Sequence, residues 1–248
     1  MNSNVKHIVQ FSGGKDSTCL LLMMLEKGMQ VDEIICCDTG KEFPQMYDHI
    51  KKVDQYIKEK YGKHITFLKA EKSFDYWMFD HVRQRGNYKG SKGYNWARAW
   101  MRWCTRVLKQ TPTKKYLKKA GEYINYIGIA FDEPKRHLLM TDRDRHPLFD
   151  WGITEKQALQ YCYEHGFDWG GLYEDFDRVS CWCCPLQPLK SLRTLYHKYP
   201  DLWEKLKDMD KKAAYSFKPN YSVEQLEERF KKDDEKETED TEAHRLDL

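Results

Sequence analysis

The residues best suited to do chemistry lie near the start of the chain, where residues 12–17 read SGGKDS. An apolar run at 7–11 precedes them and predicts a buried strand, and the apolar run that follows predicts a helix. Glycines let the backbone approach an anion, and the N–H groups and dipole of a helix N-terminus favour negative charge. The segment therefore predicts a phosphate-binding loop, with an ordinary capped turn as the alternative. The expected phosphate ligands are the two glycines, two hydroxyls and one ammonium group of Ser12, Gly13, Gly14, Lys15 and Ser17.

A second polar segment, Asp38 and Thr39, comes directly after a predicted strand at 31–37. Ligands of an open parallel sheet bind outside the carboxyl ends of its strands, so these oxygens should lie beside the phosphate loop. They could contact a nucleotide base, a ribose or Mg²⁺, and we expect Asp16 or Asp38 to place the Mg²⁺ ion. A capped start of the helix that begins at Pro44 is the alternative interpretation.

Cysteines form a third group of residues that could do chemistry. Cys181, Cys183 and Cys184 lie within four residues of one another, and Cys104 lies in a basic segment that would lower a thiol pKa. Four thiolates can bind Zn²⁺ or a [4Fe–4S] cluster, so these four are the predicted metal ligands. A cluster, a zinc ion and no metal at all remain open as interpretations. Core packing is expected for the other cysteines, which are Cys19, Cys36, Cys37 and Cys162.

The order of the predicted elements indicates how these groups are positioned. Strands alternate with helices over the first seventy residues, and a further strand is expected at 123–129. This pattern is typical of an α/β fold with a doubly wound, mostly parallel sheet. We expect a nucleotide-binding α/β domain at 1–150, which contains a basic aromatic insertion at 71–111. A helical region with the cysteine cluster should follow at 151–230, and a disordered charged tail at 231–248.

The composition narrows the class of protein. The chain has 248 residues, of which 40% are hydrophobic and 33% charged, and its net charge is +3. No apolar run approaches the roughly 20 residues of a membrane span, so we expect a cytoplasmic protein without a membrane partner. Residues 71–120 nevertheless hold thirteen Lys or Arg against three acidic residues, which predicts an anionic ligand there.

Cations and aromatic residues alternate within 88–109. Aromatic rings that stack on bases, with cations that contact phosphates, are typical of proteins that bind single-stranded nucleic acid. We therefore expect a nucleic-acid acceptor at this segment. An amphipathic helix near 97–109, with its tryptophans inward and its arginines outward, is the alternative.

The motifs together resemble the PP-loop adenine nucleotide α-hydrolase superfamily, and within it the phosphoadenylyl-sulfate (PAPS) reductase-like family. The resemblance depends on SGGKDS at 12–17, on DTGKEFP at 38–44 and on Cys181-x-x-Cys184. A further segment, 128–136, resembles the one in which the family delivers an acidic pair and an arginine to the nucleotide, so Arg136 is expected to bind it. The implied fold is the Rossmann-like PP-loop fold with a helical C-terminal region that carries the cysteines.

The resemblance also implies an activity. Reductases of this family attack sulfur with a cysteine on a C-terminal tail, and no cysteine follows Cys184 in this sequence. We therefore expect an ATP pyrophosphatase, closest in character to the enzymes of DNA phosphorothioation, that adenylates an acceptor for sulfur transfer with help from a sulfur donor protein. Lys15, Asp16 and Asp38 are the expected catalytic residues. A sulfonucleotide reductase and a non-catalytic module that binds nucleotides or nucleic acid are the alternatives.

Overall fold

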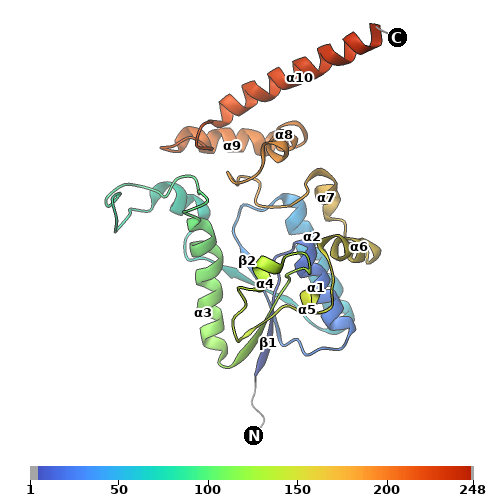
Figure 1. Cartoon of the computed structure of the whole chain (residues 1–248). Helices are drawn as coiled ribbons and strands as arrows, with labels where there is room; N and C mark the ends of the chain where they lie inside the picture. The colour runs from blue at the N-terminus through green and yellow to red at the C-terminus, as the bar shows by residue number, and fades with distance from the viewer. Residues whose placement is uncertain (1–4, 247–248) are drawn as a thin grey trace. The chain divides into compact units, whose positions relative to one another are not determined.

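A five-stranded, all-parallel sheet forms the centre of the α/β part of the chain (Figure 1). The computed structural model describes residues 5–246. The strand order is β3-β2-β1-β4-β5, so the chain reverses its direction of winding beside β1. The strands are β1 (Lys6–Gln10), β2 (Glu33–Asp38), β3 (Ile65–Lys69), β4 (Tyr123–Ile127) and β5 (Asp144–Arg145). The predicted α/β fold with a doubly wound parallel sheet is confirmed.

Helices cover both faces of this sheet (Figure 1). α1 (Lys15–Glu26) and α2 (Pro44–Tyr61) lie on one face, and α3 (Thr111–Ala120) lies on the other. α1 is buried along nearly its whole length, which explains why its sequence is apolar on all sides rather than on one stripe. On the face covered by α3, Leu117 packs with strand residues that include Ile8 and Ile35.

Four further helices come after β4 in the chain and complete this part. They are α4 (Pro134–His137), which precedes β5, and α5 (Pro147–Asp150), α6 (Glu155–Glu164) and α7 (Leu172–Asp175), which follow it. α6 packs along α1. It begins with a capping box in which the Thr154 hydroxyl accepts from the Gln157 amide, and this arrangement fixes its first turn.

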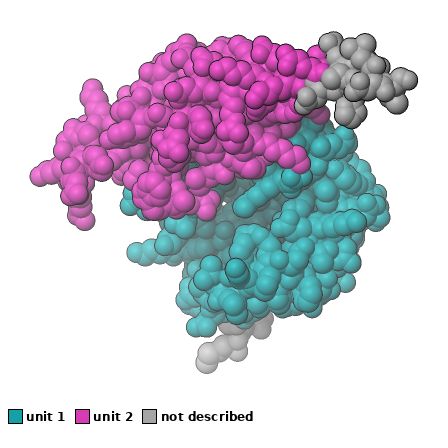
Figure 2. Space-filling model, turned by 45° about the horizontal axis from the view of Figure 1, so that its top comes forward, with its two compact units in different colours: residues 1–73, 104–179 teal, residues 74–103, 180–248 magenta. Residues whose placement is uncertain are grey.

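The chain divides into two compact units whose boundaries differ from the predicted domains (Figure 2). Unit 1 comprises residues 1–73 and 104–179, and unit 2 comprises 74–103 and 180–248. The expected boundary at residue 150 is therefore wrong, because α6 buries its apolar face on α1 within unit 1. The predicted basic aromatic insertion is divided between the two units.

Unit 2 is mainly helical. It contains a short π-helical turn (Tyr76–Asp80), α8 (Leu189–Lys198), α9 (Pro200–Lys212) and α10 (Val223–Leu246). Trp203 of α9 and Phe230 of α10 are among its buried side chains. In the part of the chain that the structure describes, no helix combines the length and the hydropathy that a membrane-spanning helix requires.

The prediction of a disordered tail from residue 231 is wrong as far as Leu246, because α10 continues through it. Its sequence has few apolar residues but is rich in Glu and Lys, which are good helix formers. Arg193 of α8 also pairs with Asp234 and Glu237. Residues 247 and 248 of the predicted tail lie outside the described part.

Candidate functional site

The phosphate loop lies between β1 and α1, as predicted. Gly13 has a φ of +81°, which favours glycine, and a Cβ there would lie 2.8 Å from Ile50 and Met46 side-chain atoms. Gly128, just after β4, packs so closely on the start of α1 that a Cβ would lie 2.8 Å from the Ser17 amide nitrogen. The two glycines therefore allow the loop and the helix N-terminus to sit on the carboxyl edge of the sheet.

The hydroxyls of this loop bond to one another. Ser12 Oγ lies 3.0 Å from Ser17 Oγ, and Ser17 Oγ donates to the carbonyl oxygen of Gly14 at 2.9 Å. These bonds hold the loop in its turn. Ser12, Gly14, Lys15 and Ser17 all line one cavity, whereas Gly13 is not among its lining residues.

Three carboxylates gather beside Lys15. Asp16 is the second residue of α1, Glu133 lies just before α4 and Glu155 is the first residue of α6. One ligand oxygen from each lies within 4.8 Å of the others, a spacing that would let them hold a cation. Lys15 Nζ lies 2.8 Å from Glu155 Oε2 and 3.6 Å from Asp16 Oδ2. The cavity thus combines an ammonium group for phosphate with oxygen ligands of the kind that Mg²⁺ prefers.

Asp16 is the most perturbed member of this group. Burial raises its pKa from 3.8 to about 6, and the positive charge of Lys15 only partly opposes that effect. Its Oδ1 atom is buried without a hydrogen-bond partner among the described residues. A buried carboxylate oxygen with no partner is costly unless a ligand satisfies it, and a metal ion would do so.

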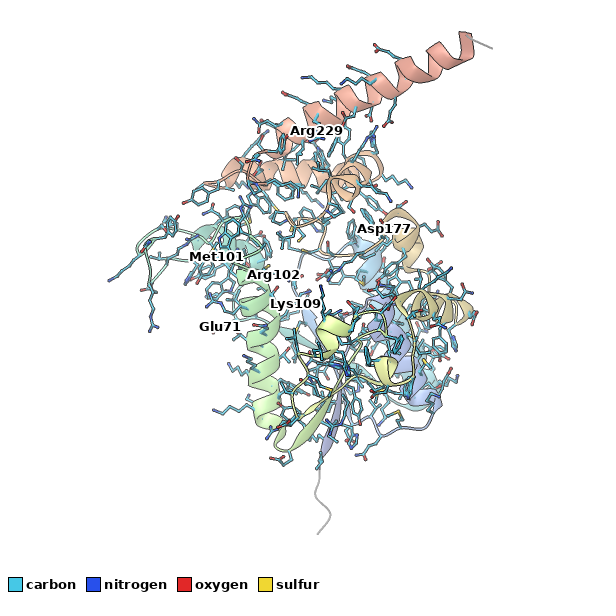
Figure 3. All side chains as sticks on the ribbon, viewed as in Figure 1. Glu71, Met101, Arg102, Lys109, Asp177 and Arg229 are labelled. Carbon is cyan, nitrogen blue, oxygen red and sulfur yellow. The ribbon has the colours of Figure 1, made fainter. Side chains whose placement is uncertain are left out.

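The carboxylates line a cavity of about 650 Å³ at the carboxyl edge of the sheet. This volume lies within the range of about 300–1,000 Å³ that is usual for small-molecule sites. Basic side chains of unit 1 also line it, namely Lys15, Lys109, Lys114, Arg136 and Arg178, of which Lys109 is labelled in Figure 3. Arg136, predicted to bind the nucleotide, donates to both carboxylate oxygens of Glu133, at 2.7 and 2.6 Å.

Asp38 and Thr39 do not line this cavity. Asp38 Oδ1 accepts from the amide of Gly40 and from the hydroxyl of Tyr47, both at 2.9 Å. Thr39 donates to Glu42 at 3.0 Å. The geometry therefore favours Asp16 over Asp38 as the carboxylate that places Mg²⁺, and the catalytic role of Asp38 stays a prediction.

Sequence reasoning misses two contributors to the site. Glu155 lies in a first helical turn, where an acidic residue is common as a partner of the helix dipole, so nothing in the sequence distinguishes it. Tyr173 lies in a segment, 169–173, whose resemblance to the family predicts only a scaffold around the cysteine site, but its hydroxyl accepts from the Lys15 amide at 2.9 Å. The paired glycines at 170 and 171 are the available signal, because they indicate a tight turn that brings α7 back over the loop.

The predicted metal cysteines are distributed over both units. Cys104 belongs to unit 1, and Cys181, Cys183 and Cys184 belong to unit 2. Within unit 2 a hydrogen bond with Cys181, together with burial, raises the pKa of Cys184, which places these two thiols side by side. Cys183 is instead 1% exposed and packs in the core. Unit 2 by itself therefore offers two adjacent thiols, and a site that uses all four cysteines stays a prediction.

Side-chain hydrogen bonds to backbone carbonyl oxygens hold the loop that carries these thiols. Gln187 Nε2 donates to the carbonyl oxygens of Cys181 and Trp182, at 3.1 and 3.0 Å. Lys218 Nζ donates to the carbonyl oxygens of Pro185 and Gln187, at 2.8 and 2.7 Å. The backbone of the thiol pair is thus held in one geometry, as a metal or redox site requires.

The basic aromatic segment has both structural and exposed residues. Trp96 and Trp103 are each 2% exposed, and Arg98 donates to backbone carbonyl oxygens of unit 2, those of Ser216 and Phe217 among them. Tyr88 and Trp100 are 56% and 81% exposed. The predicted helix at 97–109 is only partly present, because helical structure begins at Trp103 and continues through a π-helical turn (Thr105–Gln110) into α3.

A parallel α/β sheet with a glycine phosphate loop, a lysine and a carboxylate group at its carboxyl edge defines a nucleotide-binding protein of the Rossmann-like class. The family can be stated as well: the chain belongs to the phosphoadenosine phosphosulfate reductase domain family, whose model matches residues 6–187. The predicted membership in the PP-loop superfamily is confirmed.

Two uncharacterized proteins of Methanocaldococcus jannaschii are similar to the chain. MJ0066 is 26% identical over 228 residues and MJ0973 is 28% identical over 225, with 84% and 86% of this chain covered. An uncharacterized nin region protein of Escherichia phage lambda, ORF290, is 27% identical over 148 residues, with 52% of this chain covered. The chain spans 42% to 50% of the length of these relatives.

Two solved structures are also similar. The PAPS reductase from Candida auris has a TM-score of 0.47 and 16% identity, with 73% of this chain and 83% of that one covered. The U34-tRNA thiolase NcsA from Methanococcus maripaludis, with its [4Fe–4S] cluster, has a TM-score of 0.44 and 12% identity, with 84% and 71% covered.

Proposed function

We propose that the chain is an ATP pyrophosphatase that adenylates an acceptor. An oxygen of the acceptor attacks the α-phosphorus of ATP, the bond to the β-phosphate breaks, and pyrophosphate leaves. The acceptor–AMP adduct then reacts with a nucleophile, for which we propose sulfur, and AMP is released. Such a reaction depends mainly on positioning and on neutralising negative charge.

The single observation that carries this proposal is the carboxylate group of Asp16, Glu133 and Glu155 in the same cavity as the phosphate loop. Three carboxylates would repel a polyphosphate unless a cation lay between them. ATP is normally bound with Mg²⁺, which supplies that cation and stabilises charge on the phosphate oxygens when bound. A sulfonucleotide has fewer phosphates to share a metal ion and gains less from this group.

The chain's own residues have distinct tasks under this proposal. The loop amides and Lys15 bind the phosphates that leave as pyrophosphate, and the three carboxylates hold Mg²⁺. Arg136 and Lys114 line the cavity and add positive charge for the nucleotide. Asp16 is needed in its ionised form as a metal ligand, although burial disfavours that form.

The acceptor proposed is a single-stranded nucleic acid. Exposed aromatic rings at Tyr88 and Trp100, with Lys89 and Lys92 nearby in the sequence, support this choice. A sulfur donor protein and a cysteine-bound metal are the further components that sulfur transfer would use. Binding that depends on phosphate contacts should weaken steeply with added salt, and salt-independent binding would contradict the nucleic-acid acceptor.

The test of the core proposal is release of pyrophosphate from ATP with Mg²⁺, with and without short single-stranded DNA and RNA. Lys15→Ala should abolish it, and Lys51→Ala, which removes an exposed lysine of α2, should leave it intact. Full turnover in Lys15→Ala would refute the proposal. Sulfite formed from adenylyl-sulfate or PAPS would instead support a reductase, and tight ATP binding without pyrophosphate release would support a non-catalytic module.

A further inference from the structure

A strained segment crosses the phosphate loop. Trp169, Gly170 and Gly171 have φ values of +55°, +59° and +84°, so three consecutive residues lie in the left-handed region. This conformation is natural for glycine but unfavourable for a tryptophan, and it persists only where neighbouring contacts impose it. Neighbouring residues should therefore make the contacts that keep this segment in its unfavourable backbone conformation.

Two aromatic side chains of this segment bond to the phosphate loop. The indole N–H of Trp169 donates to the carbonyl oxygen of Gly13 at 2.6 Å, and its ring stacks on His49 with 4.3 Å between centroids. The Lys15 amide donates to the hydroxyl of Tyr173 at 2.9 Å. One contact thus falls on each side of Gly14, at the point where a phosphate would bind.

The Tyr173 hydroxyl faces the cavity at this point. It is the nearest atom, at 3.4 Å, to a Cβ built on Gly14, so it lies directly over the loop. Tyr173 is one of the residues that line the cavity, and Lys15 Nζ lies 5.7 Å from the centre of its ring. The hydroxyl accepts from the Lys15 amide, and its own hydrogen has no acceptor among the residues that the structure describes.

We propose that Tyr173 binds a phosphate group of the nucleotide. Its hydroxyl would donate to a phosphate oxygen while it accepts from the Lys15 amide, so the amide would act on the phosphate through the hydroxyl rather than directly. The amide would still contribute, because it donates to a hydroxyl that donates onward, and hydrogen bonds arranged in a chain strengthen one another. Burial raises the pKa of Tyr173, which keeps the hydroxyl protonated as a donor at neutral pH. The inference rests on the proposed function only for the identity of the bound phosphate.

The test is the affinity of the whole chain for inorganic pyrophosphate with Mg²⁺, measured by calorimetry, in Tyr173→Phe. Phenylalanine keeps the ring that packs on Trp169 and removes the hydroxyl, which is the proposed donor to phosphate and the acceptor of the Lys15 amide. We expect binding about 10- to 100-fold weaker, as for a lost hydrogen bond to a charged group. Tyr163→Phe is the matched control, because Tyr163 also packs against Trp169 but makes no contact with the loop among those that the structure gives.

The affinity for adenosine, which has no phosphate, distinguishes a phosphate contact of Tyr173 from a purely structural role. Tyr173→Phe should leave adenosine affinity unchanged, since that affinity does not depend on a phosphate contact. The melting temperature should fall only slightly, because the Lys15 amide loses its acceptor. Unchanged pyrophosphate affinity, an equal loss for adenosine and pyrophosphate, or no pyrophosphate binding by the natural chain would each overturn the inference. A normal Tyr173→Phe effect in a chain that never releases pyrophosphate from ATP would refute the proposed function alone.

Discussion

Replacing Asp16 with asparagine should stabilise the metal-free protein while it removes a proposed metal ligand. Burial raises the pKa of this carboxyl from 3.8 to about 6, so the folded chain holds the charged form at a cost. At pH 7.5 that cost is about 3 kcal/mol of unfolding free energy, from about 1.4 kcal/mol for each pKa unit. The asparagine side chain is neutral at every pH and avoids this cost, so unit 1 of the variant should melt about 6 to 12 °C higher.

The pH dependence gives the sign of the effect. A carboxyl whose pKa is raised on folding stabilises the fold fully below its unfolded pKa of 3.8, where both states are protonated. That contribution is lost as the pH rises through about 6, the folded value. The advantage of Asp16→Asn should therefore be small near pH 4, about half of its maximum at pH 5, and constant above pH 7.

Urea unfolding in the presence of EDTA measures this difference at each pH. Asp48→Asn is the matched control, because Asp48 lies on α2 with 74% of its side chain exposed and pairs only with Lys51 among the described ion pairs. Added Mg²⁺ should raise the stability of the natural chain and not that of Asp16→Asn, since a ligand stabilises only the state that binds it. An Asp16→Asn chain that is less stable at pH 7.5, or whose advantage does not change with pH, would refute the reasoning.

Three further predictions concern neighbouring features. Gly128→Ala should weaken ATP binding at least tenfold, because its Cβ would lie 2.8 Å from the Ser17 amide nitrogen and displace the helix N-terminus; normal affinity by calorimetry would contradict this. In anaerobically purified protein, Cys181→Ser and Cys184→Ser should each reduce bound iron or zinc, and loss of metal in Cys183→Ser as well would add the buried thiol to the ligands; full metal content in Cys181→Ser and Cys184→Ser would contradict this. Glu155→Gln should weaken Mn²⁺ binding yet strengthen metal-free pyrophosphate binding, because Glu155 pairs with Lys15 at 2.8 Å; weaker binding of both would contradict this account.

The parts of the site that follow one another in the chain can be predicted from the sequence. The loop at 12–17 can be placed because an apolar strand, two glycines and a helix start are local signals. The partners of Lys15 cannot, since Glu155 is 140 residues away and reaches it only through the packing of α6 on α1. The orientation of the Asp38 side chain cannot be predicted for a similar reason. Its position at the carboxyl end of β2 is predicted correctly, but hydrogen bonds from Tyr47 and the Gly40 amide determine where the carboxylate points.

In unit 2 the amino-acid composition predicts the structure less well than the local motifs do in unit 1. The last residues have few apolar side chains, which predicts disorder, yet helix propensity and pairs such as Glu227 with Lys231 stabilise α10. Alternation of rings and cations in the basic segment cannot show which residues are exposed. Arg98 is engaged by backbone carbonyls and Trp96 by Asp210, and only the tertiary structure of unit 2 determines such contacts.

Under the proposed function, the ion pairs of the cavity would link the metal to the nucleotide. Lys15 Nζ lies 2.8 Å from Glu155 and 3.6 Å from Asp16, so without a cation the lysine neutralises the carboxylates rather than a phosphate. A divalent cation held by those carboxylates would take over that task, and Lys15 could then turn to the phosphates. Each ligand would thereby remove the main electrostatic cost of binding the other, which is positive coupling between two sites a few ångströms apart. The same argument would explain why Asp16 can be buried with one oxygen unpartnered among the described residues: its destabilising charge would become useful only when metal and nucleotide are bound together.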